Sequence, residues 1–349
     1  MIMVNKKNKT KNYKFPEKKI IKSTDEDYIG FKLKKIIFET KEGVSKIFQL
    51  ENGHIIVMLE SGKLLSNFEY DQFSNILEKE SFSNSIHSIF SIPEMNEIVI
   101  ASKNEIIFWD DLKNEINVEL SISSEKLFPI GNDFIYLFKK EGINKHFSHD
   151  SFTIFKYFLN RKKNSLDLVK SIDTILTGDI VDVIKYDDKS IVLCTTASIH
   201  LWDIHQEIVI DSRAICYAEC LLKTSNKLYV GQSNGKIKTF GNSFQTFKIM
   251  GISDAVYSLA EYKNKILTTG GNTIKVWSCD SNKCIKTEKI HEFPITSILF
   301  ISEFEFLSSS FDGTIKKWII VDSCSIILVH FHLQKEIREK NYSIHFKFE

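Results

Sequence analysis

Long apolar runs and a secretory leader are both missing from this sequence of 349 residues. The longest apolar segment, Ile319 to Leu333, is interrupted by Asp322, so we expect no membrane-spanning helix, which needs about 18 or more apolar residues. The first residues are rich in Lys and Asn and contain no apolar centre. Such a segment does not fit a secretory signal.

Paired cysteines and metal-binding motifs are also missing. No two of the six cysteines form a C-x-x-C pair, and a chain of this size does not need disulfides to fold. We therefore expect reduced thiols in a cytoplasmic or nuclear protein. His146 and His149 lie close in sequence but have no third ligand nearby, so we predict no metal site. The cysteines are Cys194, Cys216, Cys220, Cys279, Cys284 and Cys324.

The sequence contains few glycines (14) and no Gly-rich phosphate loop or Gly-x-Ser-x-Gly motif. These absences remove the usual signals of nucleotide binding and of serine hydrolases. Two carboxylate pairs, at residues 110–111 and 187–188, fall in predicted turns, where Asp is common for local hydrogen bonding. We predict that the protein is not an enzyme and binds no cofactor.

A net positive charge is confined to one end of the chain. Residues 1–22 carry eight Lys and one Glu, and the net charge of +1 leaves −6 for the remainder. The Lys-rich segment either acts as a nuclear signal or phosphate-binding tail, or is a disordered and solvated tail. A second basic cluster lies at residues 160–163. Candidates for contact with an acidic partner are Lys6, Lys7, Lys9, Lys11, Arg161, Lys162 and Lys163.

A repeat with a period of about 40 residues is the strongest signal in the chain. Each of the four tryptophans ends the pattern x-Ile-x-x-Trp, and three further segments end the related pattern in Asn67, Tyr157 and Phe240. The seven end positions are separated by 42, 48, 45, 38, 37 and 41 residues, a period typical of four-stranded propeller blades. The tryptophans are Trp109, Trp202, Trp277 and Trp318.

The flanks of these segments repeat as well. A turn such as Asn234-Gly235 precedes each one, and a short apolar strand precedes the turn. A further strand comes before that, for example at residues 295–300 and 255–259, and a more polar strand follows each Trp position. Radial packing would cover the faces of such sheets. The pattern predicts an all-β, seven-bladed β-propeller with four-stranded antiparallel blades.

Over about residues 31–333 the units resemble the WD-repeat family. The best match is the last unit, which contains Asp312-Gly-Thr-Ile-Lys-Lys-Trp318. The resemblance implies that His291, Ser308, Asp312 and Trp318 form a hydrogen-bonded structural chain, and we prefer this role to an acid–base pair. The sequence departs from the family at Ile290, where the family has Gly, and units one, three and five lack the Trp.

We predict three regions: a basic, disordered tail over residues 1–30, the propeller over 31–333, and a C-terminal extension over 334–349 that can add a strand. A strand at about 33–39 is expected to close the ring as the outer strand of the seventh blade. The segment Ser325 to Phe331 also has a strand-like pattern and competes for that edge.

The fold alone is a weak guide to function. The resemblance implies a protein-interaction scaffold, a subunit of a larger multiprotein assembly that binds partners through loops on a face of the ring. An RNA- or ribosome-associated factor anchored by the Lys-rich tail is the alternative. A propeller enzyme is a third hypothesis, and it requires ionisable residues that converge at one mouth of the ring's centre.

Overall fold

A computed structural model describes residues 2–6, 9–13, 29–50, 53–67, 74–77, 86–92, 97–110, 115–131, 133–141, 151–160, 163, 165–174, 176–241, 246–251, 254–322 and 343–345. The chain forms two compact units: one is Lys34–Lys317, and the other combines Met1–Leu33 with Trp318–Glu349. All regular elements within the described residues are β-strands.

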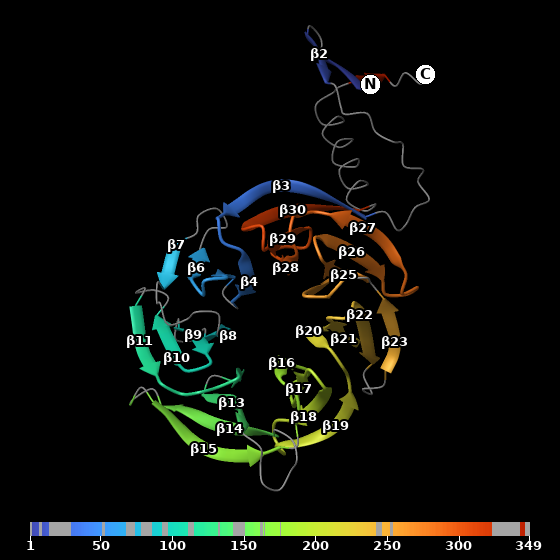
Figure 1. Cartoon of the computed structure of the whole chain (residues 1–349). Helices are drawn as coiled ribbons and strands as arrows, with labels where there is room; N and C mark the ends of the chain where they lie inside the picture. The colour runs from blue at the N-terminus through green and yellow to red at the C-terminus, as the bar shows by residue number, and fades with distance from the viewer. Residues whose placement is uncertain are drawn as a thin grey trace. The chain divides into compact units, whose positions relative to one another are not determined.

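Seven four-stranded antiparallel sheets form a ring of blades, which confirms the predicted propeller (Figure 1). The innermost strands are β4 (Val44–Gln49), β8 (Ile86–Ile92), β12 (Lys126–Ile130), β16 (Ile180–Lys185), β20 (Ala218–Lys223), β24 (Leu259–Tyr262) and β28 (Ile295–Phe300). The second strands are β5 (Ile55–Leu59), β9 (Glu97–Ser102), β13 (Phe134–Glu141), β17 (Ser190–Thr195), β21 (Lys227–Gln232), β25 (Lys265–Gly270) and β29 (Glu305–Ser310).

The x-Ile-x-x-Trp segments, and the three related segments without Trp, form the third strands of the blades. The more polar segment that follows each one forms the fourth and outermost strand. The third strands are β6 (Leu64–Asn67), β10 (Ile106–Asp110), β14 (Ser151–Asn160), β18 (Ser198–Asp203), β22 (Lys236–Gly241), β26 (Thr273–Ser278) and β30 (Thr314–Asp322). The outermost strands are β7 (Ser74–Leu77), β11 (Glu115–Leu120), β15 (Ser165–Asp173), β19 (Ile208–Ala214), β23 (Thr246–Gly251), β27 (Cys284–Lys289) and β3 (Ile29–Glu39).

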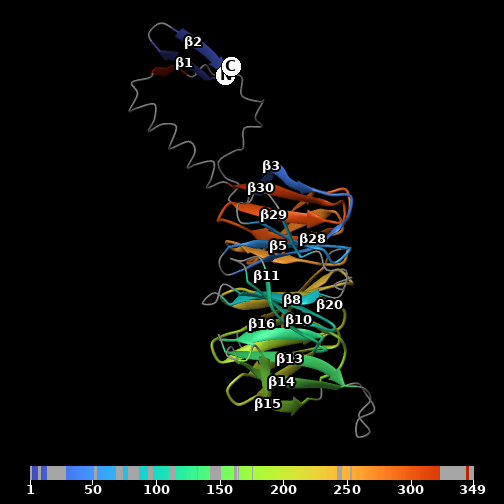
Figure 2. The same ribbon diagram turned by 90° about the vertical axis from the view of Figure 1, so that its left-hand side faces the viewer.

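Clusters of buried apolar side chains join neighbouring blades of the ring, which Figure 2 shows from its side. One cluster joins Ile56 and Leu64 of the first blade to Ile98, Ile107 and Trp109 of the second. Both faces of each middle strand are covered in this way, so β17 is buried along its whole length. Two-sided burial explains why the second strands are continuous apolar runs in the sequence and do not alternate.

A β-bulge recurs near the start of the innermost strands, and the residue that follows it contacts the next blade. Register shifts mark the bulge in β4, β8, β16, β20 and β28. In two of these blades this residue is a serine, and Ser258 holds the equivalent position in the sixth blade. The hydroxyl oxygen of each serine accepts a backbone N–H from the next blade. These bonds join Leu127 N to Ser88 Oγ (3.0 Å), Ile298 N to Ser258 Oγ (3.0 Å) and Ile47 N to Ser297 Oγ (3.3 Å).

The N-terminal strand β3 closes the ring as the outer strand of the seventh blade, in the order β28-β29-β30-β3. This confirms the prediction for residues 33–39, whereas the competing segment at residues 325–331 lies outside the described residues. Beyond β3, the Thr40 N–H donates to the Gly313 carbonyl (3.0 Å). Glu305 forms ion pairs with Lys34 (2.6 Å) and Lys317 (2.9 Å).

In the second unit, β1 (Ile2–Lys6), β2 (Lys9–Tyr13) and β31 (Ser343–His345) form a three-stranded sheet in the order β2-β1-β31. Strands therefore occur both in the segment predicted as a tail and in the C-terminal extension. The division into regions 1–30, 31–333 and 334–349 stays a prediction.

One predicted strand was misplaced. The sequence predicts an innermost strand at residues 255–259, but β24 begins only at Leu259. The reason is that the Val256 N–H donates to the Gln232 carbonyl of the previous blade (3.1 Å). The Val256 side chain is fully buried between the two blades, so this apolar segment is a blade-to-blade connection.

Gly313 provides a test of the ring closure. Its φ of +78° disfavours a side chain, and a Cβ would overlap the Thr40 carbonyl oxygen and lie 2.8 Å from that of Glu42. We expect Gly313→Ala to lower the free energy of unfolding by about 3 kcal/mol or more, because backbone strain and a backbone clash add together. Denaturant unfolding of the full chain measures this change.

Gly53→Ala is the matched control. Gly53 also has a left-handed φ, of +87°, but no atom lies within 4 Å of the position its Cβ would occupy. We expect a loss of only about 1 kcal/mol from the backbone conformation. Equal losses in the two variants would show that the Gly313 contact with residues 40–42 does not hold the ring closed.

Candidate functional site

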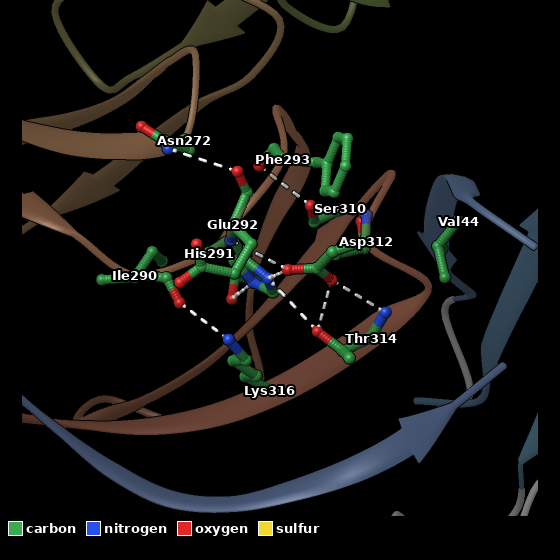
Figure 3. Close-up of polar contacts among 12 residues, drawn as sticks. Val44, Asn272, Ile290, His291, Glu292, Phe293, Ser310, Asp312, Thr314 and Lys316 are labelled. Carbon is green, nitrogen blue, oxygen red and sulfur yellow. Dashed lines mark hydrogen bonds and ion pairs between the residues drawn. The ribbon is translucent and has the colours of Figure 1, made fainter. Parts of the chain in front are cut away.

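His291 is the centre of a buried hydrogen-bonded cluster in the last blade (Figure 3). Its Nδ1 lies 2.8 Å from Asp312 Oδ2, and its Nε2 lies 2.7 Å from Ser308 Oγ. Burial lowers the pKa of His291, although the Asp312 carboxylate opposes this effect. The neutral ring therefore donates from Nδ1 to the carboxylate and accepts the Ser308 hydroxyl at Nε2.

Asp312 is held by several donors besides the imidazole. Its carboxylate accepts hydrogen bonds from the Thr314 N–H and hydroxyl (3.0 and 2.6 Å) and from the Glu292 N–H (3.1 Å). Burial opposes ionisation, but these hydrogen bonds keep the pKa of Asp312 below its ordinary value. A carboxylate that is used in this way fixes the loop before β28 and has little capacity left for proton transfer.

The structure brings His291, Ser308 and Asp312 together and places the four tryptophans in separate blades. Trp109, Trp202, Trp277 and Trp318 lie in β10, β18, β26 and β30, and each is buried. The indole N–H of Trp277 donates to Thr268 Oγ1 (3.1 Å) within the sixth blade. The four tryptophans therefore do not form one common site. The structural role assigned to them stays a prediction.

Two further histidines are held in comparable networks that the sequence analysis did not identify. The His200 ring contacts Ser198 Oγ (2.6 Å) and Ser212 Oγ (2.7 Å), and burial lowers its pKa to about 4. The His87 ring contacts Ser102 O and Ser124 Oγ (3.0 and 3.1 Å), and burial lowers its pKa to about 4 as well. His200 lies two residues before Trp202, a spacing that could have marked it.

The basic candidates do not build a patch within the described part of the chain. Lys6 lies in β1, and Lys9 and Lys11 lie in β2. Lys163 is exposed in a turn. Lys7, Arg161 and Lys162 lie outside the described residues. Their contact with an acidic partner stays a prediction.

One face of the ring carries exposed aromatic side chains on three consecutive blades. This loop face bears the loops that lead into the innermost strands and the turns between second and third strands. Tyr217, Tyr257 and Phe293 precede β20, β24 and β28, and they are 61%, 43% and 59% exposed. Phe311 (39% exposed) lies in the adjoining turn, and its N–H donates to the Pro294 carbonyl (3.1 Å). We call these four residues the aromatic arc.

The backbone holds the arc in place. Tyr217 has a left-handed φ of +63°, which is unfavourable for a bulky residue. Its N–H donates to the Thr196 carbonyl (3.1 Å), and its carbonyl accepts the Ser233 N–H (2.8 Å). Ser310 Oγ donates to the carbonyl of Phe293 (3.0 Å; Figure 3). Because the backbone is already held, only the aromatic side chains have to be ordered when a partner covers them.

The surroundings of the aromatic arc are acidic. The described loop-face segments of blades five to seven (215–219, 233–235, 254–257, 271–272, 290–294 and 311–313) contain four carboxylates and no Lys or Arg. One of them, Glu292, is paired with Lys289 at the end of β27 (3.0 Å). The carboxylates belong to Glu219, Asp254, Glu292 and Asp312.

A second cluster of ionisable residues meets at the ring axis. Lys126 of the third blade forms an ion pair with Asp182 of the fourth (2.9 Å). Lys46 of the first blade interacts electrostatically with both, and with Cys220 of the fifth. Blades one and four are not neighbours in the ring, so these side chains can meet only near its axis. Lys46, Asp182 and Cys220 each follow the bulge of their strand, and Lys126 holds the equivalent position in the third blade.

The axial cluster does not combine a nucleophile with a base. Burial raises the pKa of the Cys220 thiol far above neutrality, and its Sγ donates to the Val256 carbonyl (3.3 Å). Asp182 is engaged by Lys126 and by the Val183 N–H (3.0 Å). Within the residues that the structure describes, no group of three His, Cys, Asp or Glu could hold a metal ion.

Comparison with known proteins gives no family assignment. Neither a model of a known protein family nor a curated protein sequence matches this chain. Among the described residues, no helix is long and apolar enough to cross a membrane. The architecture and the two side-chain clusters are therefore the basis for any functional inference.

His200 provides a test of the buried networks by pH. Its pKa is about 4 in the folded protein and 6.5 in an exposed histidine, so the unfolded chain binds more protons between these values. Its contribution to stability is complete above pH 6.5 and is lost as the pH falls towards 4, by up to about 3 kcal/mol. We expect His200→Gln to flatten this part of the stability profile, measured by denaturant unfolding at several pH values.

His205→Gln is the control, because His205 is exposed on the turn that follows the same strand. We expect its profile to follow that of the unmodified protein. The network interpretation fails if His200→Gln leaves the dependence between pH 6.5 and 4 as steep as before.

Proposed function

We propose that this propeller is a non-catalytic scaffold, a WD-repeat-type subunit of a larger multiprotein assembly in the cytoplasm or nucleus. Seven-bladed propellers are commonly protein-interaction scaffolds. The observation that carries the proposal is the aromatic arc, whose members lie in loops and a turn on one face of three consecutive blades. The five described cysteines are free thiols, which suits a reducing compartment.

Aromatic side chains are the residues that most often dominate protein–protein binding energy. Tyr217 and Phe293 are more than half exposed, and hydrogen bonds of the backbone, rather than burial of their side chains, set their positions. A partner that covers both gains roughly 1.5–3 kcal/mol for each fully buried side chain. The rigid ring keeps the spacing between them constant, so little ordering is required on binding.

The charges favour a basic partner segment. Glu219 and Asp254 flank Tyr217 and Tyr257 in sequence, and the chain outside residues 1–22 has a net charge of −6. Lys or Arg side chains of a partner can pair with these carboxylates and stack on the exposed rings. Such complementarity raises association rates and selects among partners.

The alternative is an RNA- or ribosome-associated factor, favoured by the +7 charge of residues 1–22. Binding of this kind would weaken steeply with salt, because it releases counterions from phosphates. It would also disappear with deletion of the tail. Neither property is expected of the aromatic arc.

Affinity purification of the tagged full chain from its native cells, with nuclease treatment and mass spectrometry, tests the proposal. We expect stoichiometric protein partners that survive nuclease. The double variant Tyr217→Ala with Phe293→Ala should lose at least one of them, with a drop in affinity of roughly tenfold or more for each anchor that its partner buries.

The double variant Ile208→Ala with Ile210→Ala is the matched control. These residues are 50% and 54% exposed on the outer strand β19, away from the loop face. Retention of every partner by the aromatic variant would exclude the arc. Recovery of ribosomal or RNA-processing proteins that vanish with nuclease would favour the alternative.

A further inference from the structure

The residues that follow the bulge of the innermost strands form one ring of equivalent positions, which we call the axial positions. The bulges identify five of them, and the blade-to-blade hydrogen bonds of Ser258 and of Leu127 N identify the sixth and seventh. In blade order the axial residues are Lys46, Ser88, Lys126, Asp182, Cys220, Ser258 and Ser297.

At three axial positions a serine accepts a backbone N–H of the following blade, which is a structural task. A lysine ammonium has no acceptor and cannot perform it. In the third blade the axial residue is Lys126, which cannot accept the Val183 N–H of the fourth blade. That N–H donates instead to the side chain of its own neighbour, Asp182 (3.0 Å). The two axial lysines therefore replace a stabilising contact with a charge, which blade packing does not explain.

The charges at the axis are not balanced. Lys126 is paired with Asp182 (2.9 Å), and its side chain is only 10% exposed. Lys46 forms no ion pair with a described residue, and its ammonium lies 5.1 Å from the centroid of the Phe48 ring. Among the axial residues, two ammonium groups thus lie near one carboxylate, and only Lys126 is paired with it. Lys46 is exposed to solvent, so a small solute can reach it.

The pKa shifts of the neighbouring groups are consistent with an excess of positive charge at the axis. Although solvent reaches the Lys46 side chain, the protein atoms around its ammonium lower the pKa of Lys46 by desolvation, and the charge of Lys126 lowers it further; Asp182 partly opposes both effects. Nearby His87, whose pKa is lowered by burial and by Lys126, is neutral at pH 7 and adds no charge. Repulsion between desolvated like charges is relieved when an anion binds between them.

We propose that Lys46 and Lys126 form a binding site at the ring axis for a small oxyanion, namely the phosphate or carboxylate group of a ligand. Each ammonium has three N–H donors, and Lys126 uses one of them on Asp182. The site draws on residues from the first and third blades and is independent of the aromatic arc.

Calorimetric titration of the full chain with inorganic phosphate, and separately with succinate, tests the site at constant low ionic strength. We expect saturable binding with one anion per chain, weakened at least tenfold by Lys46→Gln and largely retained by Lys46→Arg. Phosphate binding without succinate binding would assign the site to phosphate groups, and the opposite result to carboxylates.

Asp182→Asn gives a test that misfolding cannot imitate. Removal of the carboxylate that competes for both lysines should tighten anion binding several-fold. Lys103→Gln, on an exposed turn of the second blade, is the control and should leave binding unchanged. Phosphate binding should also persist in the Tyr217→Ala with Phe293→Ala variant, which separates this site from partner binding.

The proposal is overturned if neither anion binds saturably to the unmodified chain. It is also overturned if Lys103→Gln weakens binding as much as Lys46→Gln does, because the effect then belongs to overall charge. Weaker binding in Asp182→Asn would contradict the proposed arrangement of the three charged groups.

Discussion

Both faces of a blade are buried only while its two neighbours stay in place, so the closure between the last blade and the first supports every other contact in the ring. The chain makes this closure with main-chain groups: β3 joins the seventh blade, and the Thr40 N–H binds the Gly313 carbonyl beyond it. Val44 of the first blade shares a buried cluster with Leu307 and Ile315 of the last. Strand pairing, main-chain hydrogen bonding and a buried apolar cluster therefore hold the first and last blades together.

Closure by main-chain groups leaves many side chains of the repeat free to vary. The Trp position shows this variation: the third strands of blades one, three and five end their pattern in Asn67, Tyr157 and Phe240 and still pair in register. The buried histidine networks vary too, since His87, His200 and His291 use different serine partners in different blades. The blade geometry is therefore kept although the blades differ from one another at these positions.

The blades, their strand order and the closing strand could be predicted from the sequence because they depend on local periodicity and on turns such as Asp312-Gly313. Where a segment bonds to another blade, as Val256 does, local periodicity misplaced the strand. The aromatic arc and the axial cluster could not be predicted in this way. Lys46 and Lys126 are 80 residues apart in sequence, and only the curvature of the ring and a bulge in each strand bring their charges together.

Sites in a repeat protein are best sought where one repeat departs from a structural rule that the others obey. In three blades an axial serine bonds to the next blade, whereas the axial residues of the other four are Lys46, Lys126, Asp182 and Cys220. The aromatic arc is another departure, because Tyr217 keeps a left-handed backbone without glycine and exposes its ring. Strain and unbalanced charge are both unfavourable for folding alone. The propeller fold does not require either feature, and these two costs are the observations on which the two proposals rest.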